Sequence, residues 1–337
     1  MSSSSGTTIH RSPRLMRLHE SDARAIRIEL ATGLLASVPS IAPKFLYDAL
    51  GSRLFAAITE LSEYYPTRTE AAIFRTHRNA IAAAVGEGCT LVDLGAGNCE
   101  KAASLFDALR PTRYVAIDIS ADYLADALDY LQFRHPALDL LGVGMDFSTT
   151  FNLPDEANVD ACVVFYPGSS IGNFTPQAAE KFLRQVRLAA KGGGLLIGVD
   201  LNKPSEILEP AYDDALGVTA AFNRNMLTVA NRLLGANFEV ADFRHVAFFN
   251  RVESRIEMHL EAVRDASVRW PDAAANSSQD LTQESVRVFR AGERIHTENS
   301  YKYTPDNFAA LLRRAGYTRI TKWTDADEWF GVFWADG

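Results

Sequence analysis

The order of apolar and polar residues predicts helices in the first quarter of the chain. Residues 21–36 repeat apolar side chains with helical spacing, and a second helix is predicted around residues 52–55. The stretch from Thr67 to Glu70 has a capping-box pattern, which predicts the start of a helix over residues 67–84. These helices precede the first strongly apolar run of the chain.

Short apolar runs then alternate with helical patterns. The runs predict strands near residues 90–94, 113–117, 139–144, 159–165 and 194–200, with helices near 99–109, 121–134 and 176–190. Alternation of this kind is typical of an α/β fold with a parallel sheet.

The pattern changes after Lys203. A helix is predicted over residues 213–234, followed by strand-like runs at 243–250, 255–263 and 286–294; a helix at 305–315 and strands at 318–323 and 329–334 then close the chain. We therefore expect an α+β module inserted into the α/β domain. The expected division is a disordered N-terminus over residues 1–19, one domain formed by 68–203 and 302–337, and a substrate-binding domain formed by 20–67 and 204–301.

Composition narrows the class of partner. The chain has 337 residues, 47% of them hydrophobic, and a formal net charge of -8 without a long Lys/Arg run. This excludes a strongly basic nucleic-acid binder and favours a small-molecule partner. No stretch approaches the ~20 apolar residues of a membrane helix, and the start lacks the apolar core of a signal peptide. We expect a cytoplasmic monomer with no membrane partner.

The cysteines and histidines do not indicate a metal or disulfide framework. Cys89, Cys99 and Cys162 lie far apart without a C-x-x-C pair, and the seven histidines show no ligand spacing. We expect reduced cysteines and no metal site.

A glycine turn carries the first functional signal. The predicted strand at 90–94 leads into Gly95 and Gly97, and the next strand ends in Asp118. This arrangement holds nucleoside-containing cofactors in doubly wound folds, where the acid accepts from the ribose hydroxyls. A dinucleotide site needs a third glycine, which is missing here, and Asp93 just ahead of the turn would repel a pyrophosphate. The same carboxylate suits the cationic amino-acid end of S-adenosylmethionine, although an ordinary strand-turn-helix stays an alternative.

Two further segments offer contacts for an amino acid. Asn173 follows the fourth parallel strand, at the edge of the sheet where such folds bind ligands, and its amide can both donate and accept. The alternative is that Asn173 caps the next helix. Glu298 and Ser300 alternate on one strand face about 6.5–7 Å apart, a spacing that can bracket a five-membered ring. The alternative here is a pair of surface residues on an edge strand.

Seven segments occur together in an order that resembles a known family. They are KFLYD (44–48), GSRLF (51–55), EYYPTR (63–68), GSSIGN (168–173), AYDD (211–214), RIEM (255–258) and TENS (297–300). Over residues 25 to 335 the chain resembles the histidine Nα-methyltransferases of ergothioneine biosynthesis. The resemblance implies a class I, Rossmann-like methyltransferase domain with an inserted α+β substrate-binding domain, and trimethylation of the α-amine of L-histidine to hercynine with S-adenosylmethionine.

The resemblance also implies the site. It assigns the substrate's amino and carboxylate groups to Tyr47, Tyr64, Gly168, Asn173 and Tyr212, with Tyr47 and Asn173 as the catalytic pair. It assigns the imidazole nitrogens to Glu298 and Ser300, the ring face to Met258, and the cofactor to Gly95, Lys101, Asp118, Asp146 and Phe147. The glycine turn itself adds Asp93 and Gly97 to the expected cofactor residues. Rival interpretations are N-methylation of another amino acid, such as tryptophan, tyrosine or a prenylated tryptophan, a nicotinamide oxidoreductase, and a non-catalytic ligand-binding relative.

Overall fold

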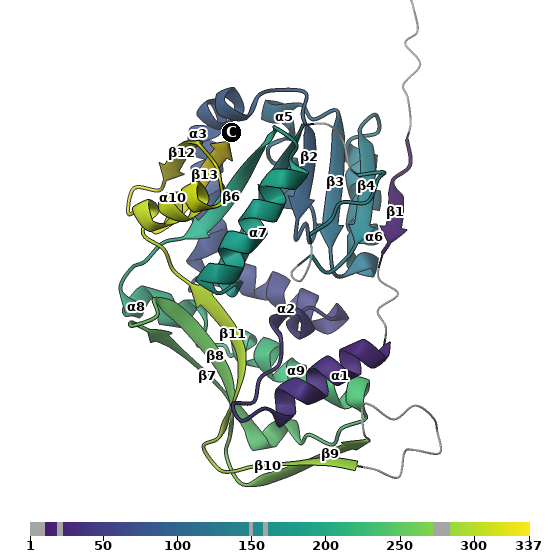
Figure 1. Ribbon diagram of the computed structural model, residues 1–337, viewed down its shortest axis with the longest axis vertical. Helices are drawn as coiled ribbons and strands as arrows, with labels where there is room; N and C mark the ends of the chain where they lie inside the picture. The colour runs from purple at the N-terminus through teal and green to yellow at the C-terminus, as the bar shows by residue number, and fades with distance from the viewer. Residues whose placement is uncertain (1–10, 19–22, 148–150, 158–160, 272–283) are drawn as a thin grey trace, which may run out of the picture.

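The upper half of the molecule is a large mixed sheet (Figure 1). The computed structural model describes residues 11–18, 23–147, 151–157, 161–271 and 284–337. Within them the sheet order is β1-β4-β3-β2-β5-β6-β13-β12. The strands are β1 (Arg14–Arg17), β2 (Thr90–Leu94), β3 (Arg113–Asp118), β4 (Asp139–Gly144), β5 (Cys162–Tyr166), β6 (Gly194–Asp200), β12 (Arg319–Thr324) and β13 (Phe330–Asp336). β13 runs antiparallel to both of its neighbours, and the other pairs are parallel.

Helices cover both faces of this sheet, as near-continuous apolar strands require. One face packs against α7 (Pro176–Ala189) and α10 (Pro305–Arg314). The other packs against α3 (Tyr65–Val85), α4 (Glu100–Ala103), α5 (Phe106–Leu109) and α6 (Ala121–Arg134). Among the described helices, none combines the length and apolar character that crossing a bilayer requires.

The lower half has its own core (Figure 1). It contains α1 (Ala23–Leu35), α2 (Ala49–Thr59), α8 (Ser205–Leu208) and α9 (Val218–Leu234) beside the antiparallel sheet of β7 (Phe243–Asn250), β8 (Arg255–Ala262) and β11 (Arg294–Tyr301). A hairpin of β9 (Ala266–Pro271) and β10 (Glu284–Phe289) extends from it. These separate cores support the predicted two-domain division, whose exact limits stay a proposal.

The N-terminal prediction is partly wrong. Residues 1–10 and 19 lie outside the described residues, but residues 14–17 form β1 at the edge of the large sheet. Leu15 pairs with Gly142, whose missing side chain leaves room for the Leu15 methyl groups. The four-residue strand was too short to stand out from the polar residues around it.

Three other predicted elements need correction. The strand predicted at 286–294 is correct only as far as Phe289, because a turn, with Gly292 in the left-handed region, separates β10 from β11. The helix expected over 99–109 is divided into α4 and α5. The capping box is also wrong, because α3 begins before Thr67 and the Glu70 side chain bonds elsewhere.

Asp48 joins α2 to α9 directly beside Tyr47. Its carboxylate caps α2 by accepting from the Gly51 backbone at 2.8 Å, and it accepts from Asn225 at 2.8 Å and Arg232 at 2.9 Å on α9. Burial would raise the pKa of Asp48, but these hydrogen bonds lower it below its usual value. The ionised carboxylate therefore stabilises the fold.

We predict that Asp48→Ala lowers the free energy of unfolding by about 1–3 kcal/mol, since a cap and two bonds between helices are lost. Because the folded pKa is lowered, this contribution is present above the unfolded value of about 3.9 and disappears as the pH falls below it. Urea denaturation at neutral and acid pH measures both effects. Arg232→Ala, which removes one largely exposed partner, is the control and should cost under about 1 kcal/mol.

Candidate functional site

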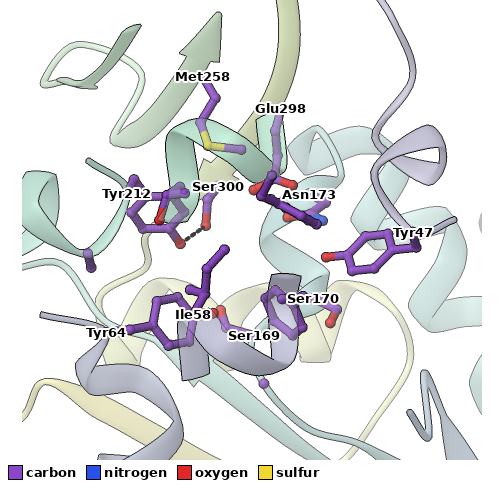
Figure 2. A pocket seen from close by; sticks show the side chains of 15 residues that line it. Tyr47, Ile58, Tyr64, Ser169, Ser170, Asn173, Tyr212, Met258, Glu298 and Ser300 are labelled. Atoms are coloured by element: carbon purple, nitrogen blue, oxygen red, sulfur yellow. Dashed lines mark hydrogen bonds between the residues drawn. The ribbon is translucent and has the colours of Figure 1, made fainter. Parts of the chain in front are cut away.

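A pocket opens where the two halves of the molecule meet (Figure 2). One wall is the loop after β5, which includes a short 3-10 helix over Ser170–Asn173. The other walls come from α2, α9, β8 and β11. The lining residues are Tyr47, Phe55, Ile58, Tyr64, Gly168, Ser169, Ser170, Asn173, Ala211, Tyr212, Thr219, Phe222, Met258, Glu298 and Ser300. The pocket lies at the carboxyl edge of the large sheet, where parallel folds bind ligands.

All eight predicted substrate residues line this one pocket. They are Tyr47, Tyr64, Gly168, Asn173, Tyr212, Met258, Glu298 and Ser300. Sequence separations of about 130 residues are closed because β11 and the loop after β5 pack against each other. Gly172 permits that contact, since a Cβ there would lie 2.9 Å from the Tyr301 carbonyl oxygen. The roles of the eight residues stay predictions.

Asn173 does not cap the following helix. Thr175 occupies the N-cap of α7, and its hydroxyl accepts from the Ala178 backbone at 3.3 Å. The capping alternative is therefore wrong. The Asn173 amide instead borders the pocket, and no hydrogen bond from the described chain reaches it.

Other polar atoms of the pocket also lack protein partners. Within the described residues, the Tyr47 and Tyr64 hydroxyls and the Glu298 carboxylate make no hydrogen bond. Burial, and then neighbouring charges such as that of Glu298, raises the pKa of both tyrosines well above the usual value. They are therefore neutral phenols near pH 7, able to donate to and accept from a ligand.

Glu298 is a buried acid, so the surface alternative is wrong. Its exposed fraction is 7%, and that of Ser300 on the same strand is 4%. Burial raises the pKa of Glu298 to about 7, while the positive charge of Lys302 acts in the opposite direction. A carboxyl group that titrates near neutrality and has no partner is typical of a functional site.

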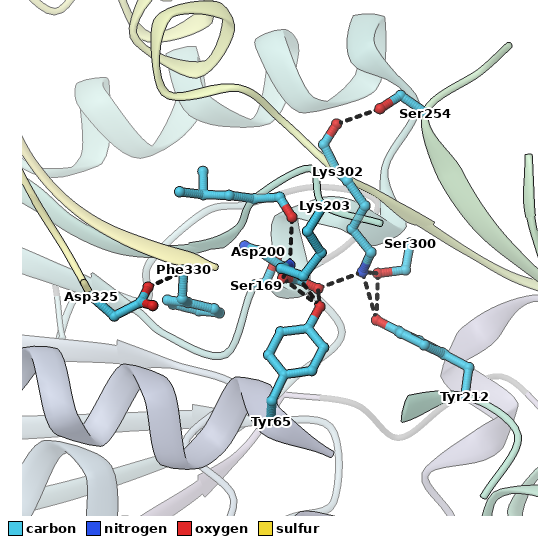
Figure 3. Close-up of polar contacts among 11 residues, drawn as sticks. Tyr65, Ser169, Asp200, Lys203, Tyr212, Ser254, Ser300, Lys302, Asp325 and Phe330 are labelled. Atoms are coloured by element: carbon cyan, nitrogen blue, oxygen red, sulfur yellow. Dashed lines mark hydrogen bonds and ion pairs between the residues drawn. The ribbon is translucent and has the colours of Figure 1, made fainter. Parts of the chain in front are cut away.

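A network of buried charges lies behind the pocket (Figure 3). Asp200, 1% exposed at the end of β6, accepts from Lys302 at 2.7 Å and Tyr65 at 2.8 Å, and it pairs with Lys203. Burial would raise the pKa of Asp200, but the two lysines lower it. Lys302 also donates to Ser300 at 2.8 Å, so the network reaches the pocket wall.

Sequence reasoning missed this network. Two signals were available. Lys302 follows Ser300 by two residues and so shares its strand face, and Asp200 is an acid at the end of an apolar run. Neither signal identifies its partner, because Asp200 and Lys302 are about a hundred residues apart.

The predicted cofactor residues gather at the ends of β2 and β3. Gly95 and Gly97 both have positive φ, and the Gly97 N–H donates to Asp118 at 2.9 Å. The ring of Phe147 lies 3.9 Å from the place where a Cβ on Gly95 would stand. Burial raises the pKa of Asp118, and backbone N–H groups oppose that shift. The glycine turn and this acid therefore lie together, as the sequence predicted for a nucleoside-containing cofactor.

Asp93 lies deeper than these residues. It accepts from the Tyr114 hydroxyl at 2.7 Å through one oxygen, and the other buried oxygen has no partner in the described chain. Burial raises the pKa of Asp93 to about 7. An orphaned carboxylate oxygen beside the glycine turn fits a cationic ligand group, as predicted for S-adenosylmethionine.

Glu70 connects the cofactor side to the substrate side. Its two carboxylate oxygens accept from Lys101 at 2.7 Å and from the Gly168 backbone at 2.8 Å. Gly198 makes room for it, because a Cβ there would lie 2.0 Å from Glu70. Asp146 is more peripheral, and the Lys44 ammonium lies 3.4 Å from it.

The fold and site together define a class I methyltransferase that uses S-adenosylmethionine: a parallel sheet ending in an antiparallel hairpin, a glycine turn after β2, and an acid at the end of β3. Comparison with known proteins agrees. The sequence profile of a family described as histidine-specific, SAM-dependent methyltransferases matches residues 26–336. The chain belongs to this family.

Individual relatives span nearly the whole chain. The histidine N-alpha-methyltransferase of Mycolicibacterium smegmatis is 42% identical over 318 residues, which cover 93% of this chain and 95% of that protein. Its counterpart from Mycobacterium tuberculosis is 40% identical over 313 residues, 91% of this chain and 94% of that protein. Ergothioneine biosynthesis protein 1 of Neurospora crassa is 29% identical, covering 90% of this chain and 35% of that protein. The resemblance and the S-adenosylmethionine cofactor are confirmed, and the oxidoreductase alternative is wrong.

We predict that Asp118→Ala weakens binding of S-adenosylhomocysteine by about 1.5–3 kcal/mol, the range for hydrogen bonds to a charged group. Isothermal titration calorimetry measures the change. Asp122→Ala is the control, because this exposed acid on α6 pairs with Arg17 at the sheet edge and does not lie at the glycine turn. Equal affinities for wild type and Asp118→Ala would remove Asp118 from the cofactor site.

Proposed function

We propose that the enzyme transfers three methyl groups from S-adenosylmethionine to the α-amine of L-histidine, giving hercynine for ergothioneine biosynthesis. The observation that carries this proposal is the pocket itself. Neutral tyrosine hydroxyls, the Asn173 amide, the Glu298 carboxylate and the Ser300 hydroxyl all line this one pocket. Membership of the family and the names of its relatives give independent support.

The amine end of the substrate is assigned to Tyr47, Tyr64 and Asn173. None of these three side chains is ionised near pH 7, so they can bond a neutral amine without adding a negative charge that would stabilise an ammonium ion. The Asn173 amide can accept from the amine and donate to the carboxylate. Tyrosine ring faces also tolerate the quaternary cation of the product.

Orientation provides most of the catalysis in this proposal. When bound, S-adenosylmethionine supplies a methyl group that its sulfonium already activates, so the chain must only present an unprotonated amine in line. Asp93, Gly95, Gly97, Lys101, Asp118, Asp146 and Phe147 would hold this cofactor. The contacts of Glu70 with Lys101 and Gly168 fix the two sides of the site relative to each other.

The side chain of the substrate is assigned to Glu298, Ser300 and Met258. An ionised Glu298 accepts from one imidazole N–H, Ser300 bonds the second nitrogen, and Met258 packs over the ring. The runner-up function is N-methylation of another amino acid, such as tryptophan. An indole is larger than an imidazole and offers one N–H with no second ring nitrogen for Ser300 to bond. The predicted monomeric state and cytoplasmic location stay predictions, which size-exclusion chromatography and cell fractionation test.

The purified enzyme should methylate L-histidine in preference to every other proteinogenic amino acid. The test incubates it with S-adenosylmethionine and each amino acid in turn, and mass spectrometry detects gains of one, two or three methyl groups. A preference for tryptophan would retain the fold and cofactor but contradict the histidine assignment. Omission of S-adenosylmethionine serves as the control.

Glu298→Gln should lower kcat/KM for histidine above pH 7, because it removes a charged acceptor and keeps the shape of the side chain. The loss should correspond to about 1.5–3 kcal/mol of transition-state stabilisation. Since burial raises the pKa of Glu298 to about 7, the wild-type carboxylate becomes protonated as the pH falls through that value. The ratio of wild-type to variant kcat/KM should therefore shrink between about pH 8 and pH 6.

Glu257→Gln is the matched control for this pH series. Glu257 lies on β8, the strand next to β11. It pairs with Arg255 and His259 and does not line the pocket. Its ratio to wild type should not follow the same titration. A Glu298→Gln ratio that is constant across the pH range would show that ionised Glu298 does not bind the ring.

A further inference from the structure

Lys302 has no role in the proposed reaction so far, yet its ammonium group lies directly behind the pocket wall (Figure 3). The residue is 3% exposed. Its Nζ atom lies 2.7 Å from an Asp200 oxygen, 2.8 Å from the Tyr212 hydroxyl and 2.8 Å from the Ser300 hydroxyl. An ammonium group has three N–H donors and no acceptor, so these contacts use all three donors.

This arrangement restricts where the hydroxyl protons of Tyr212 and Ser300 lie. Both oxygens accept from Lys302, and the two hydroxyls also bond each other at 2.8 Å. Each hydroxyl has one proton, so one of the two protons fills the bond between them. The other cannot point towards Lys302. It is left for the pocket, which both residues line.

Glu298 provides a hydrogen-bond acceptor in the pocket, where the Ser300 and Tyr212 pair provides a donor. This carboxylate lines the same pocket and has no hydrogen-bond partner in the described chain, and the positive charge of Lys302 favours its ionised form. The pocket thus presents one acceptor at Glu298 and one donor at Ser300 or Tyr212. A neutral imidazole, which has one N–H and one unprotonated nitrogen, is the complement of that pair.

We infer that Lys302 is a positioning residue for substrate specificity, which directs a hydroxyl donor from the Ser300 and Tyr212 pair at the unprotonated nitrogen of the imidazole. The inference rests on the proposed histidine substrate. Without the Lys302 ammonium, no donor occupies the lone pairs on this side of the two hydroxyls, so the second proton is no longer restricted to the pocket. The pocket then distinguishes a ring nitrogen from a C–H group less strongly.

The test replaces Lys302 by methionine, which has a similar length and no donor. Steady-state kinetics are measured with L-histidine and with pyrrolylalanine, which keeps one ring N–H but has a C–H group in place of the acceptor nitrogen. The wild type should prefer histidine in kcat/KM by at least about tenfold. In Lys302→Met this ratio should fall to about threefold or less, through a higher KM for histidine with kcat within about threefold.

Lys203→Met is the matched control. Lys203 is buried on the same Asp200 carboxylate, but it bonds Tyr65 and the Leu201 carbonyl and does not contact Tyr212 or Ser300. It should keep the wild-type ratio of histidine to pyrrolylalanine. A thermal shift with S-adenosylhomocysteine checks that each variant is folded. If Lys302→Met does not bind S-adenosylhomocysteine, Lys302→Gln is used in its place. This variant should give an intermediate ratio of histidine to pyrrolylalanine, because an amide has two donors instead of three.

Two failures are distinguishable. If the wild type does not methylate histidine, the proposed function is wrong. If it does, and folded Lys302→Met or Lys302→Gln keeps the wild-type ratio, the positioning role is overturned. An equal fall of the ratio in Lys203→Met also overturns it, because the effect would then come from the charge around Asp200 and not from the hydroxyl contacts.

Discussion

The ion pair of Asp200 with Lys302 and Lys203 is the contact on which the arrangement of the two halves depends. It lies where the chain leaves the large sheet after β6 and returns to it after β11. The two passages run side by side there, joined by a bridge between Leu201 and Tyr303. Removing one partner from the buried Asp200 carboxylate would cost free energy of folding. This crossing of the two passages, after β6 and after β11, therefore favours a single arrangement. That arrangement holds β11, and with it Glu298 and Ser300, against the carboxyl edge of the sheet.

The same crossing also holds the loop that carries Asn173. The Asp200 backbone N–H donates to the Ser169 hydroxyl at 2.8 Å, and the neighbouring Gly168 N–H donates to Glu70. Glu70 in turn accepts from Lys101 in the helix after the glycine turn. Cofactor-side and substrate-side residues are therefore connected through short hydrogen bonds that are buried or partly buried. Such a connection suits a reaction in which rate comes from the alignment of two bound molecules.

Burial determines the protonation states of the site. The tyrosines stay neutral, and the pKa values of Glu298 and Asp93 are both raised to about 7, because few polar partners compensate for the loss of water. The two acids differ in their neighbours: Asp93 accepts from Tyr114, whereas Glu298 faces the pocket with Lys302 behind it. A site that must take up an amine without its proton benefits from such low polarity.

The sequence by itself determined most of the local elements, the glycine turn with Asp118, and, through the order of its motifs, the family and eight of the residues that line the pocket. Apolar periodicity and turn residues act over a few positions, so they are readable along the chain. Only the tertiary structure decided that residues 14–17 join the sheet, that Glu70 bonds Lys101 and Gly168 instead of capping α3, and that Asp200 and Lys302 meet. Those outcomes depend on which segments, far apart in the sequence, pack against one another. The burial of whole sheet and helix faces determines that packing, and the sequence neighbours of a single residue do not.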